Sequence, residues 1–204
     1  MFQKLTLLPI VLLGLASTLY GQNQTKPALA DSPKAALKAQ DSAAQSGDVD
    51  ADMAFYQADG DQQKKLAHVI AGGDVAVAKL QKAVSDRFGK ELAAAAVRAA
   101  GTEDADAIDA ATEHVDGDRA TVQFQHQQSA VPMIRQDGKW KVSLGEWTKG
   151  ASSQDVDQLI AKLDQLTQEI TRITDLVTHD KFRSGEGIRD RVQELHDQIF
   201  APSR

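Results

Sequence analysis

Two different spacings of apolar residues divide the sequence after residue 30. From residue 33 to residue 100, and again from residue 156, apolar residues recur every three or four positions, which predicts amphipathic helices. Between residues 111 and 147 apolar and polar residues alternate, which predicts strands with one buried face. This order predicts an α+β fold in which N-terminal helices pack on a curved antiparallel sheet, a cone, followed by a C-terminal helical hairpin.

Capping residues and glycines predict where the first helices begin and end. Ser32 is a good N-cap, Pro33 suits a first helical turn, and Gly47 ends the helix. The pair Gly72-Gly73 is expected to break the chain, with Asp74 capping the helix that follows. The predicted helices cover residues 33–46, 61–71, 75–88 and 90–100, and residues 48–59 form a loop or a short packed turn.

The alternating stretch contains two hairpin signals, at Asp116-Gly117-Asp118 and at Asp137-Gly138. A two-residue turn at the second signal pairs Gln136 with Lys139 and puts Arg135 opposite Trp140. The last strand is expected to extend to the second tryptophan, Trp147. One sheet face is then left for the helices to cover, made of Val131, Met133, Arg135, Trp140, Val142 and Leu144, with Ala120, Val122, Phe124 and His126 from the preceding strand.

Two apolar seams with near-heptad spacing follow a boundary at residues 150–153. The first comprises Val156, Leu159, Leu163, Leu166, Ile170, Ile173 and Val177, and the second Ile188, Val192, Leu195 and Ile199. Two interpretations stay open. The helices cover their own chain, or residues 156–199 contact a second copy or another protein as a coiled coil. We therefore divide the chain into a domain at residues 31–150 and an amphipathic helical hairpin at residues 151–204.

The first thirty residues are typical of an export signal. Lys4 gives a short positive start, an apolar run extends from Leu5 to Leu19, and Ala28-Leu29-Ala30 suits a signal peptidase. This run is shorter than the roughly 20 residues that a spanning helix needs, which favours a cleaved signal peptide at residues 1–30 over a retained anchor. We therefore predict an exported protein, either periplasmic or extracellular.

Composition narrows the partners that this chain is expected to have. The sequence contains no cysteine, so no disulfide can stabilise the fold of the protein after export. The formal charge is −6 at pH 7, and it falls to −8 without residues 1–30, which carry Lys4 and Lys26 and no acidic residue. The sequence contains no cluster of lysine and arginine, which argues against binding to nucleic acid or to anionic membrane surfaces.

Three local motifs accompany the order of helices followed by sheet. They are a first helix followed by Gly47-Asp48, a strand entry at residues 117–122, and the run Asp137-Gly138-Lys139-Trp140-Lys141-Val142. Together they resemble the nuclear-transport-factor-2-like, or cystatin-like cone, superfamily, in particular its small exported bacterial members of unassigned function. The resemblance covers residues 33–147 and implies a cone. The superfamily includes isomerases, dehydratases, ligand binders and scaffolds, so the resemblance implies no single activity.

Few residues offer chemistry inside such a cone. Enzymes of this superfamily use an Asp or His there as a base, and Glu113, His126 and Glu146 are the weak catalytic candidates in this sequence. The simplest role for Arg135 is a cation–π pair with Trp140 across the hairpin. A ligand pocket between sheet and helices would be lined by Tyr56, Phe88, Phe124, Met133, Arg135 and Trp140.

Neither a metal site nor a cofactor is predicted. The five histidines show no short paired spacing, and the acidic residues at 104–109 lack the glycine and glutamate of a calcium-binding loop. Asp48, Asp50 and Asp52 alternate in a segment expected to be a solvated turn. The leading hypothesis is a non-enzymatic binding or assembly module of the cell envelope or periplasm. The alternative is a small-molecule-binding or isomerase- or dehydratase-like cone with an internal pocket.

Overall fold

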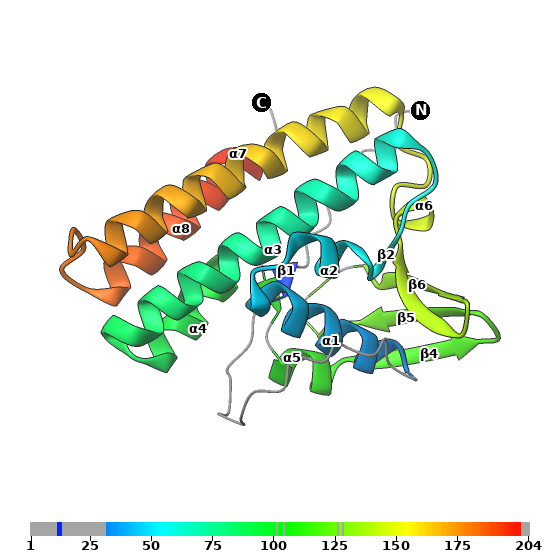
Figure 1. The fold of residues 1–204 in the computed structure, drawn as a ribbon, viewed down its shortest axis with the longest axis horizontal. Helices are drawn as coiled ribbons and strands as arrows, with labels where there is room; N and C mark the ends of the chain where they lie inside the picture. Colours follow the sequence, from blue (N-terminus) through cyan, green and yellow to red (C-terminus); the bar gives the residue numbers. More distant parts are fainter. Residues whose placement is uncertain are drawn as a thin grey trace.

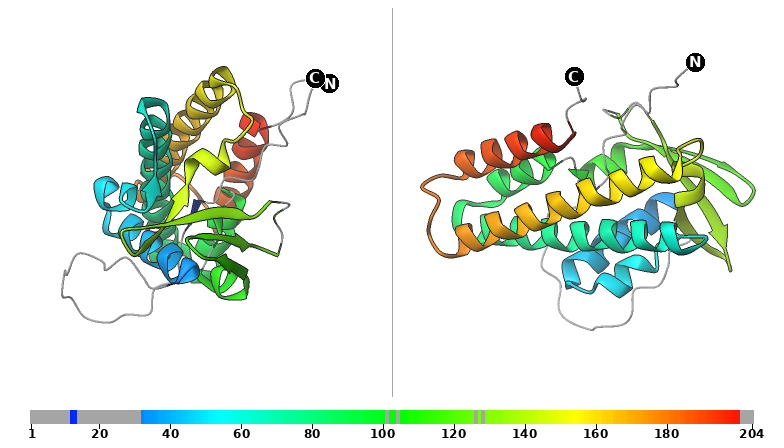
Figure 2. Two further views of the ribbon diagram at one scale, coloured as in Figure 1. Left: turned by 90° about the vertical axis from the view of Figure 1, so that its right-hand side faces the viewer. Right: turned by 90° about the horizontal axis from the view of Figure 1, so that it is seen from above.

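The computed structural model describes residues 12–13, 32–100, 102–103, 105–125, 127 and 129–200 of the 204 residues. Within them the chain forms an α+β fold, as predicted, with a five-stranded mixed sheet and helices packed on it (Figures 1 and 2). The predicted signal segment lies outside the described residues, apart from strand β1 (Leu12–Leu13). This strand pairs in parallel with β3 (Thr102–Glu103).

The first helix has the ends that its sequence predicts. In α1 (Pro33–Ser46) the side chain of Ser32 accepts a hydrogen bond of 3.2 Å from the backbone N–H of Ala35. Gly47 follows the helix with a φ of 80°, a left-handed conformation that glycine adopts without strain. The buried side of α1 carries Ala36, Leu37, Ala43 and Ala44, and also the polar residues Gln40 and Asp41.

The segment at residues 48–59, predicted as a loop or short turn, contains a helix and a strand. Helix α2 (Val49–Met53) begins at Asp48, whose carboxylate accepts a hydrogen bond of 3.0 Å from the N–H of Ala51. Strand β2 (Tyr56–Gln57) follows and joins the edge of the sheet. A helix of one turn is too short to show a hydrophobic period, so the spacing of apolar residues did not predict it.

A single helix, α3 (Asp61–Phe88), replaces the two that Gly72-Gly73 was predicted to separate. Each interior glycine costs a helix about 1 kcal/mol relative to alanine. Gly73 and Asp74 are buried, and the long helix α7 packs along α3, so tertiary contacts outweigh this cost. Asp74 is therefore a buried residue inside α3 and does not cap a new helix. Helix α4 (Lys90–Ala99) begins after Gly89, as predicted.

The sheet is formed mainly by two hairpins. Strands β4 (Thr112–Asp116), β5 (Arg119–Gln123), β6 (Val131–Gln136) and β7 (Lys139–Ser143) are antiparallel neighbours in this order. Strand β2 pairs in parallel with β7, which makes the sheet mixed. The short helix α5 (Ala105–Ala110) precedes β4 and contacts α1.

The predicted register of the second hairpin is confirmed. Gln136 pairs with Lys139 and Arg135 with Trp140 around the Asp137-Gly138 turn. The apolar residues predicted to share one face are buried, namely Ala120, Val122, Phe124, Val131, Met133, Trp140 and Val142. Among the described residues of this face Arg135 is the exception, because it lies close to the turn of the hairpin and is exposed.

The last strand ends earlier than predicted. Strand β7 stops at Ser143, and Leu144 and Trp147 belong to the short helix α6 (Leu144–Trp147). Leu144 is still buried, because the turn of α6 directs it into the core, whereas Trp147 is half-buried. Alternation predicts the inward-facing residues correctly but does not show where the strand ends.

Two glycines of this fold are expected to respond to alanine in opposite directions. Gly138 has a φ of 74°, where alanine is strained, so Gly138→Ala should lower the free energy of unfolding by about 1–2 kcal/mol. Gly72 lies inside α3 with no atom within 4 Å of the position that a Cβ would take, so Gly72→Ala should raise it by up to about 1 kcal/mol. Urea denaturation of the two variants measures both changes. A loss of stability in Gly72→Ala would contradict an unbroken α3.

The C-terminal helices pack on the helices of their own chain. Helix α7 (Ser153–Thr178) runs beside α3, and α8 (Gly185–Phe200) packs more extensively on α4 than on α7 (Figure 1). Ser152 and Asp155 form a capping box at the start of α7. The seams are buried at Val156, Leu163, Leu166, Ile170, Ile173, Val177, Ile188, Val192, Leu195 and Ile199, in one core with the sheet face.

Arg87, at the end of α3, holds the connection between α7 and α8. Its guanidinium donates hydrogen bonds to the carbonyl oxygens of Val177 (2.7 Å) and Phe182 (2.9 Å) and forms an ion pair of 2.7 Å with Asp180. A cation at this position also complements the partial negative charge at the C-terminus of α7. One side chain thereby joins the end of α3 to the turn after α7.

Candidate functional site

A polar groove crosses the face of the sheet that is turned away from the helices. We name it the sheet groove; its volume is about 410 Å³. Its floor includes Pro132 and Ile134 of β6, both half-buried. Polar residues from the other strands and from α6 surround this floor, namely Gln57, Asp59, His114, Asp116, Arg119, Thr121, Ser143 and Glu146.

The fold places these side chains through the alternation of the strands. Ala120 and Val122 of β5 point into the core, so Arg119 and Thr121 between and beside them point outward. The register then aligns Thr121 with His114 on β4. Because the strand residues of the groove belong to a paired sheet, the groove has a rigid base.

One carboxylate of the groove is held by two cations. Arg119 donates a hydrogen bond of 3.1 Å to Glu146, and Lys149 donates one of 3.2 Å to the other carboxylate oxygen. The hydrogen bond from Arg119, followed by that from Lys149, lowers the pKa of Glu146. On this geometry Glu146 is a stable anion, which is unsuited to taking up a proton near neutral pH.

Two other carboxylates of the groove have no ion-pair partner among the described residues. Asp59 follows β2 and accepts a hydrogen bond from the side chain of Gln57, which in turn accepts one of 3.2 Å from Ser143. Asp116 ends β4 and is exposed. The two acids lie toward opposite edges of the sheet, because β2 and β4 are its outer strands.

Of the three catalytic candidates from the sequence, the two that the structure describes, Glu146 and Glu113, lie in different places. Glu146 lies in the groove, on the outer side of the sheet, and not in a cone interior. Glu113 is exposed on the edge strand β4, where its carboxylate accepts a hydrogen bond of 3.2 Å from the backbone N–H of Lys34 in the first turn of α1. Glu113 therefore stabilises a helix N-terminus. His126 lies outside the described residues.

Most of the predicted pocket-lining residues contribute to the core. Phe124, Met133 and Trp140 are 1%, 3% and 3% exposed, and they pack in one cluster with the helices. Arg135 lies 5.9 Å from the centroid of the Trp140 ring, so the predicted cation–π pair is confirmed. Phe88 is half-buried at the end of α3, with the guanidinium of Arg87 4.8 Å from its ring centroid.

Tyr56 belongs to a second polar site, which the sequence did not predict. Its hydroxyl donates a hydrogen bond of 2.9 Å to Asp74, and the side-chain amide of Gln40 donates to the Tyr56 hydroxyl and, at 3.1 Å, to Asp74. Asp41 and Asp52 complete the group. We name these five residues, Gln40, Asp41, Asp52, Tyr56 and Asp74, the acid cluster.

Burial of the acid cluster changes the protonation of its members. Asp41, Asp52 and Asp74 are each 0% exposed. Burial, followed by the negative charge of Asp74, raises the pKa of Asp41 to about 8 and that of Asp52 to about 10. The same two causes raise the pKa of Tyr56 well above its ordinary value. Asp41 and Asp52 are therefore protonated at neutral pH.

The prediction that Asp52 lies in a solvated turn is wrong. The sequence did indicate that one acid of the cluster, Asp41, is buried. Asp41 falls between Leu37 and Ala44 on the apolar side of the first helix, whereas acidic residues of an amphipathic helix normally lie on its polar side. Asp52 and Asp74 gave no such signal, because each resembled an ordinary helix-start or turn residue. Their burial depends on how α2 and α3 pack against α1.

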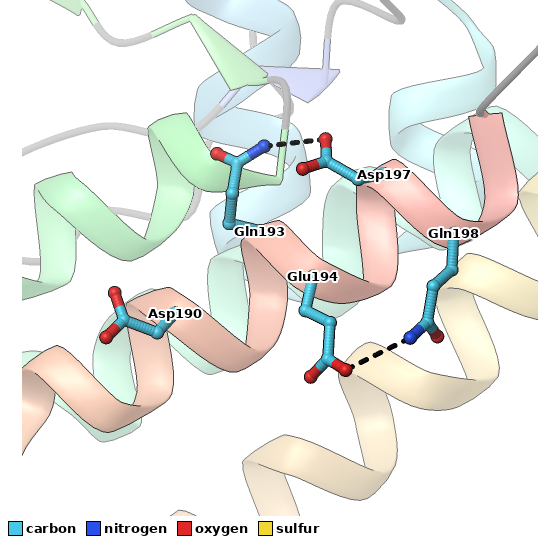
Figure 3. Close-up of a pocket in the computed structure, with 5 residues that line it drawn as sticks. All are labelled: Asp190, Gln193, Glu194, Asp197 and Gln198. Atoms are coloured by element: carbon cyan, nitrogen blue, oxygen red, sulfur yellow. Dashed lines mark hydrogen bonds between the residues drawn. The ribbon is translucent and has the colours of Figure 1, made fainter.

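A shallow depression on α8 does not form a site. It is lined by Asp190, Gln193, Glu194, Asp197 and Gln198, all on one helix (Figure 3). Gln193 donates to Asp197 (2.9 Å) and Gln198 to Glu194 (3.1 Å), pairs that are ordinary for residues four apart on a helix surface. Among the described residues no three histidine or acidic side chains are placed to hold a metal ion.

The sequence matches no family model, and neither the curated proteins nor the solved structures provide a match. Within the described part of the chain, every helix is too short or too polar to cross a bilayer.

Proposed function

We propose that this protein is a non-enzymatic binding module and that the sheet groove is its ligand site. The observation that carries the proposal is the groove itself, a concave surface of about 410 Å³ on a rigid sheet. Its size falls in the range of about 300–1,000 Å³ that is usual for ligand pockets, and its apolar floor with polar sides has the usual composition.

The charges of the groove favour a cationic ligand. Asp59 and Asp116 stand without an ion-pair partner among the described residues, whereas Arg119 is already engaged by Glu146. The half-buried Pro132 and Ile134 between them favour an aliphatic body. A ligand with an aliphatic chain and an ammonium group toward each end matches this arrangement.

A titration with spermidine tests the groove. The amide resonances of β5, β6 and β7 around the groove should shift, and Asp59→Asn with Asp116→Asn should weaken binding about tenfold, since each surface ion pair contributes up to about 1 kcal/mol. Asp118→Asn is the matched control for Asp116→Asn, because it removes one carboxylate from the same hairpin outside the groove. Equal weakening by the control, or no shift at millimolar spermidine, would contradict the proposal.

We also propose that the module works outside the cytoplasm, in the periplasm or cell envelope. The support is the positive start, apolar run and small residues at positions 1–30. A cleaved signal peptide is favoured over a retained anchor, because the apolar run is short. Mass spectrometry of the secreted or periplasmic protein, with the N-terminus determined, tests this proposal directly.

Membership of the nuclear-transport-factor-2-like superfamily, with its cone, is likewise a proposal. It is supported by the order of helices before the antiparallel strands and by the register around Asp137-Gly138. In the same proposal α7 and α8 form a helical hairpin added to the cone. Assembly with another chain through residues 156–199 would use the exposed polar sides of these helices, because their apolar seams are buried within the chain.

A further inference from the structure

We propose that the acid cluster is a proton-dependent latch, which holds α1 and α2 on α3 while the carboxyl groups of Asp41 and Asp52 carry protons and releases them when these protons are lost. The latch is independent of the sheet groove and of what the groove binds. It is carried by the way three carboxyl groups from three different helices meet in one buried place.

The geometry of the cluster makes it a junction between elements. Asp41 comes from α1, Asp52 from α2 and Asp74 from α3, and all three are fully buried. Tyr56 of β2 and Gln40 of α1 connect to Asp74 by hydrogen bonds. Any change in charge here acts on all three helix contacts at once.

The cluster has few donors for its oxygen atoms. Both carboxyl oxygens of Asp52 are buried without a hydrogen-bond partner among the described residues, as are Oδ1 of Asp41 and Oε1 of Gln40. A protonated carboxyl can donate a hydrogen bond to such an acceptor, whereas an ionised one cannot. The arrangement therefore fits the protonated state of Asp41 and Asp52.

The charges that act on Asp41, Asp52 and Tyr56 from the described residues disfavour ionisation. The negative charges that raise the pKa of Asp41, Asp52 and Tyr56 come from Asp41, Asp52 and Asp74, and the only groups that lower these pKa values are the neutral amides of Gln40 and Gln45. The groups facing the cluster are Gln40, Asp41 and Gln45 from α1, Asp52 from α2, Tyr56 from β2 and Asp74 from α3.

The sign of the pH dependence follows from these shifts. In the released state Asp41 and Asp52 have ordinary pKa values near 3.8, and in the closed state their pKa values are about 8 and about 10. Between these limits the closed state binds protons that the released state has lost. The closed state is therefore most stable below pH 3.8. As the pH rises from there toward the closed-state pKa of a group, that group lowers the equilibrium constant for closure by up to about tenfold per pH unit.

Release should be local, because α3 is held independently on its other side. Helix α7 packs along α3 and contributes no residue to the cluster. Loss of the latch therefore affects α1, α2 and β2 before it affects the contact of α3 with α7. Local opening of this kind is measurable by hydrogen exchange.

Hydrogen exchange of the full chain between pH 6 and pH 8, corrected for the intrinsic rate, tests the latch. Protection of residues 33–57 should fall by at least about a hundredfold over these two units, whereas protection of α7 stays constant. In Asp52→Asn, which keeps the size and removes one titrating group, protection should be higher at pH 8 and fall less steeply. Asp50→Asn, an exposed neighbour on α2, is the matched control and should behave as the unchanged chain.

Two results would overturn the latch. One is constant protection of residues 33–57 across the range, and the other is an identical profile in Asp52→Asn and the unchanged chain. If Asp52→Asn does not fold, Asp41→Asn takes its place. In the unchanged chain, carboxyl carbon resonances of Asp41 and Asp52 that titrate near pH 4 would also exclude the latch.

Discussion

Ile170→Ala is expected to lower the free energy of unfolding by about 3 kcal/mol. Ile170 is 0% exposed at the centre of the α7 seam, and truncation of a buried isoleucine leaves a cavity as well as removing buried apolar surface. The loss should be the same at protein concentrations that differ a hundredfold, because the seam is buried inside one chain. Urea denaturation at the two concentrations measures it.

The matched control for this prediction lies on the same helix. Gln165 is exposed on α7, so Gln165→Ala should change the free energy of unfolding by no more than about 0.5 kcal/mol. The free energy of unfolding of the unchanged chain could instead rise with protein concentration, and rise less in Ile170→Ala. This result would mean that the seam is an interface between chains. Sedimentation equilibrium on both proteins would then show the assembly directly.

Trp140→Ala is expected to cost about 3–5 kcal/mol, the largest effect of any single truncation in the sheet. Trp140 is 3% exposed on the face that the helices cover, and it is the largest residue there. Trp140→Phe should retain most of the stability, because an aromatic ring still fills the site. Thermal and urea denaturation measure the series.

Arg135→Ala separates the cation–π pair from the packing of the indole. The guanidinium lies 5.9 Å from the ring centroid at an exposed position, so its removal should cost about 0.5–1 kcal/mol. A cost below about 1 kcal/mol for Trp140→Ala would contradict its place in the core. A cost for Arg135→Ala close to that of Trp140→Ala would instead assign the stability to the pair.

The sheet was largely predictable from the sequence, because its signals are local. The Asp137-Gly138 turn fixes the register, and a period of two then assigns each residue to a face. Leu144 was assigned to the correct side but to the wrong element, since alternation continues for a residue or two into a turn. The end of β7 depends on α6, whose formation depends on its neighbours.

The helices were predictable in position and less so in length. Gly72-Gly73 is a strong local signal for a break, yet α3 continues through it because α7, which lies far along the chain, packs beside it. The heptad spacing of α7 predicted an apolar stripe correctly. Spacing alone does not say what covers a stripe, which is why the two interpretations stayed open.

The candidate sites were the least predictable part, for a physical reason. The sheet groove unites residues from several strands of the sheet, and of its polar residues only Glu146 stood out in the sequence. Of the buried acids only Asp41 broke the apolar pattern of its helix, whereas Asp52 and Asp74 looked like surface residues, because charge normally implies solvent. Burial of three acids together is a property of the packed tertiary structure.

Strand β2 has a consequence for engineering this protein. It has only two residues, yet Tyr56 reaches the acid cluster and Gln57 reaches the sheet groove, because neighbouring side chains of a strand point in opposite directions. Inserting or deleting one residue in this strand would exchange the two, placing an amide in the core and a phenol on the surface. Tags, linkers and circular permutations should therefore leave the length of residues 54–60 unchanged.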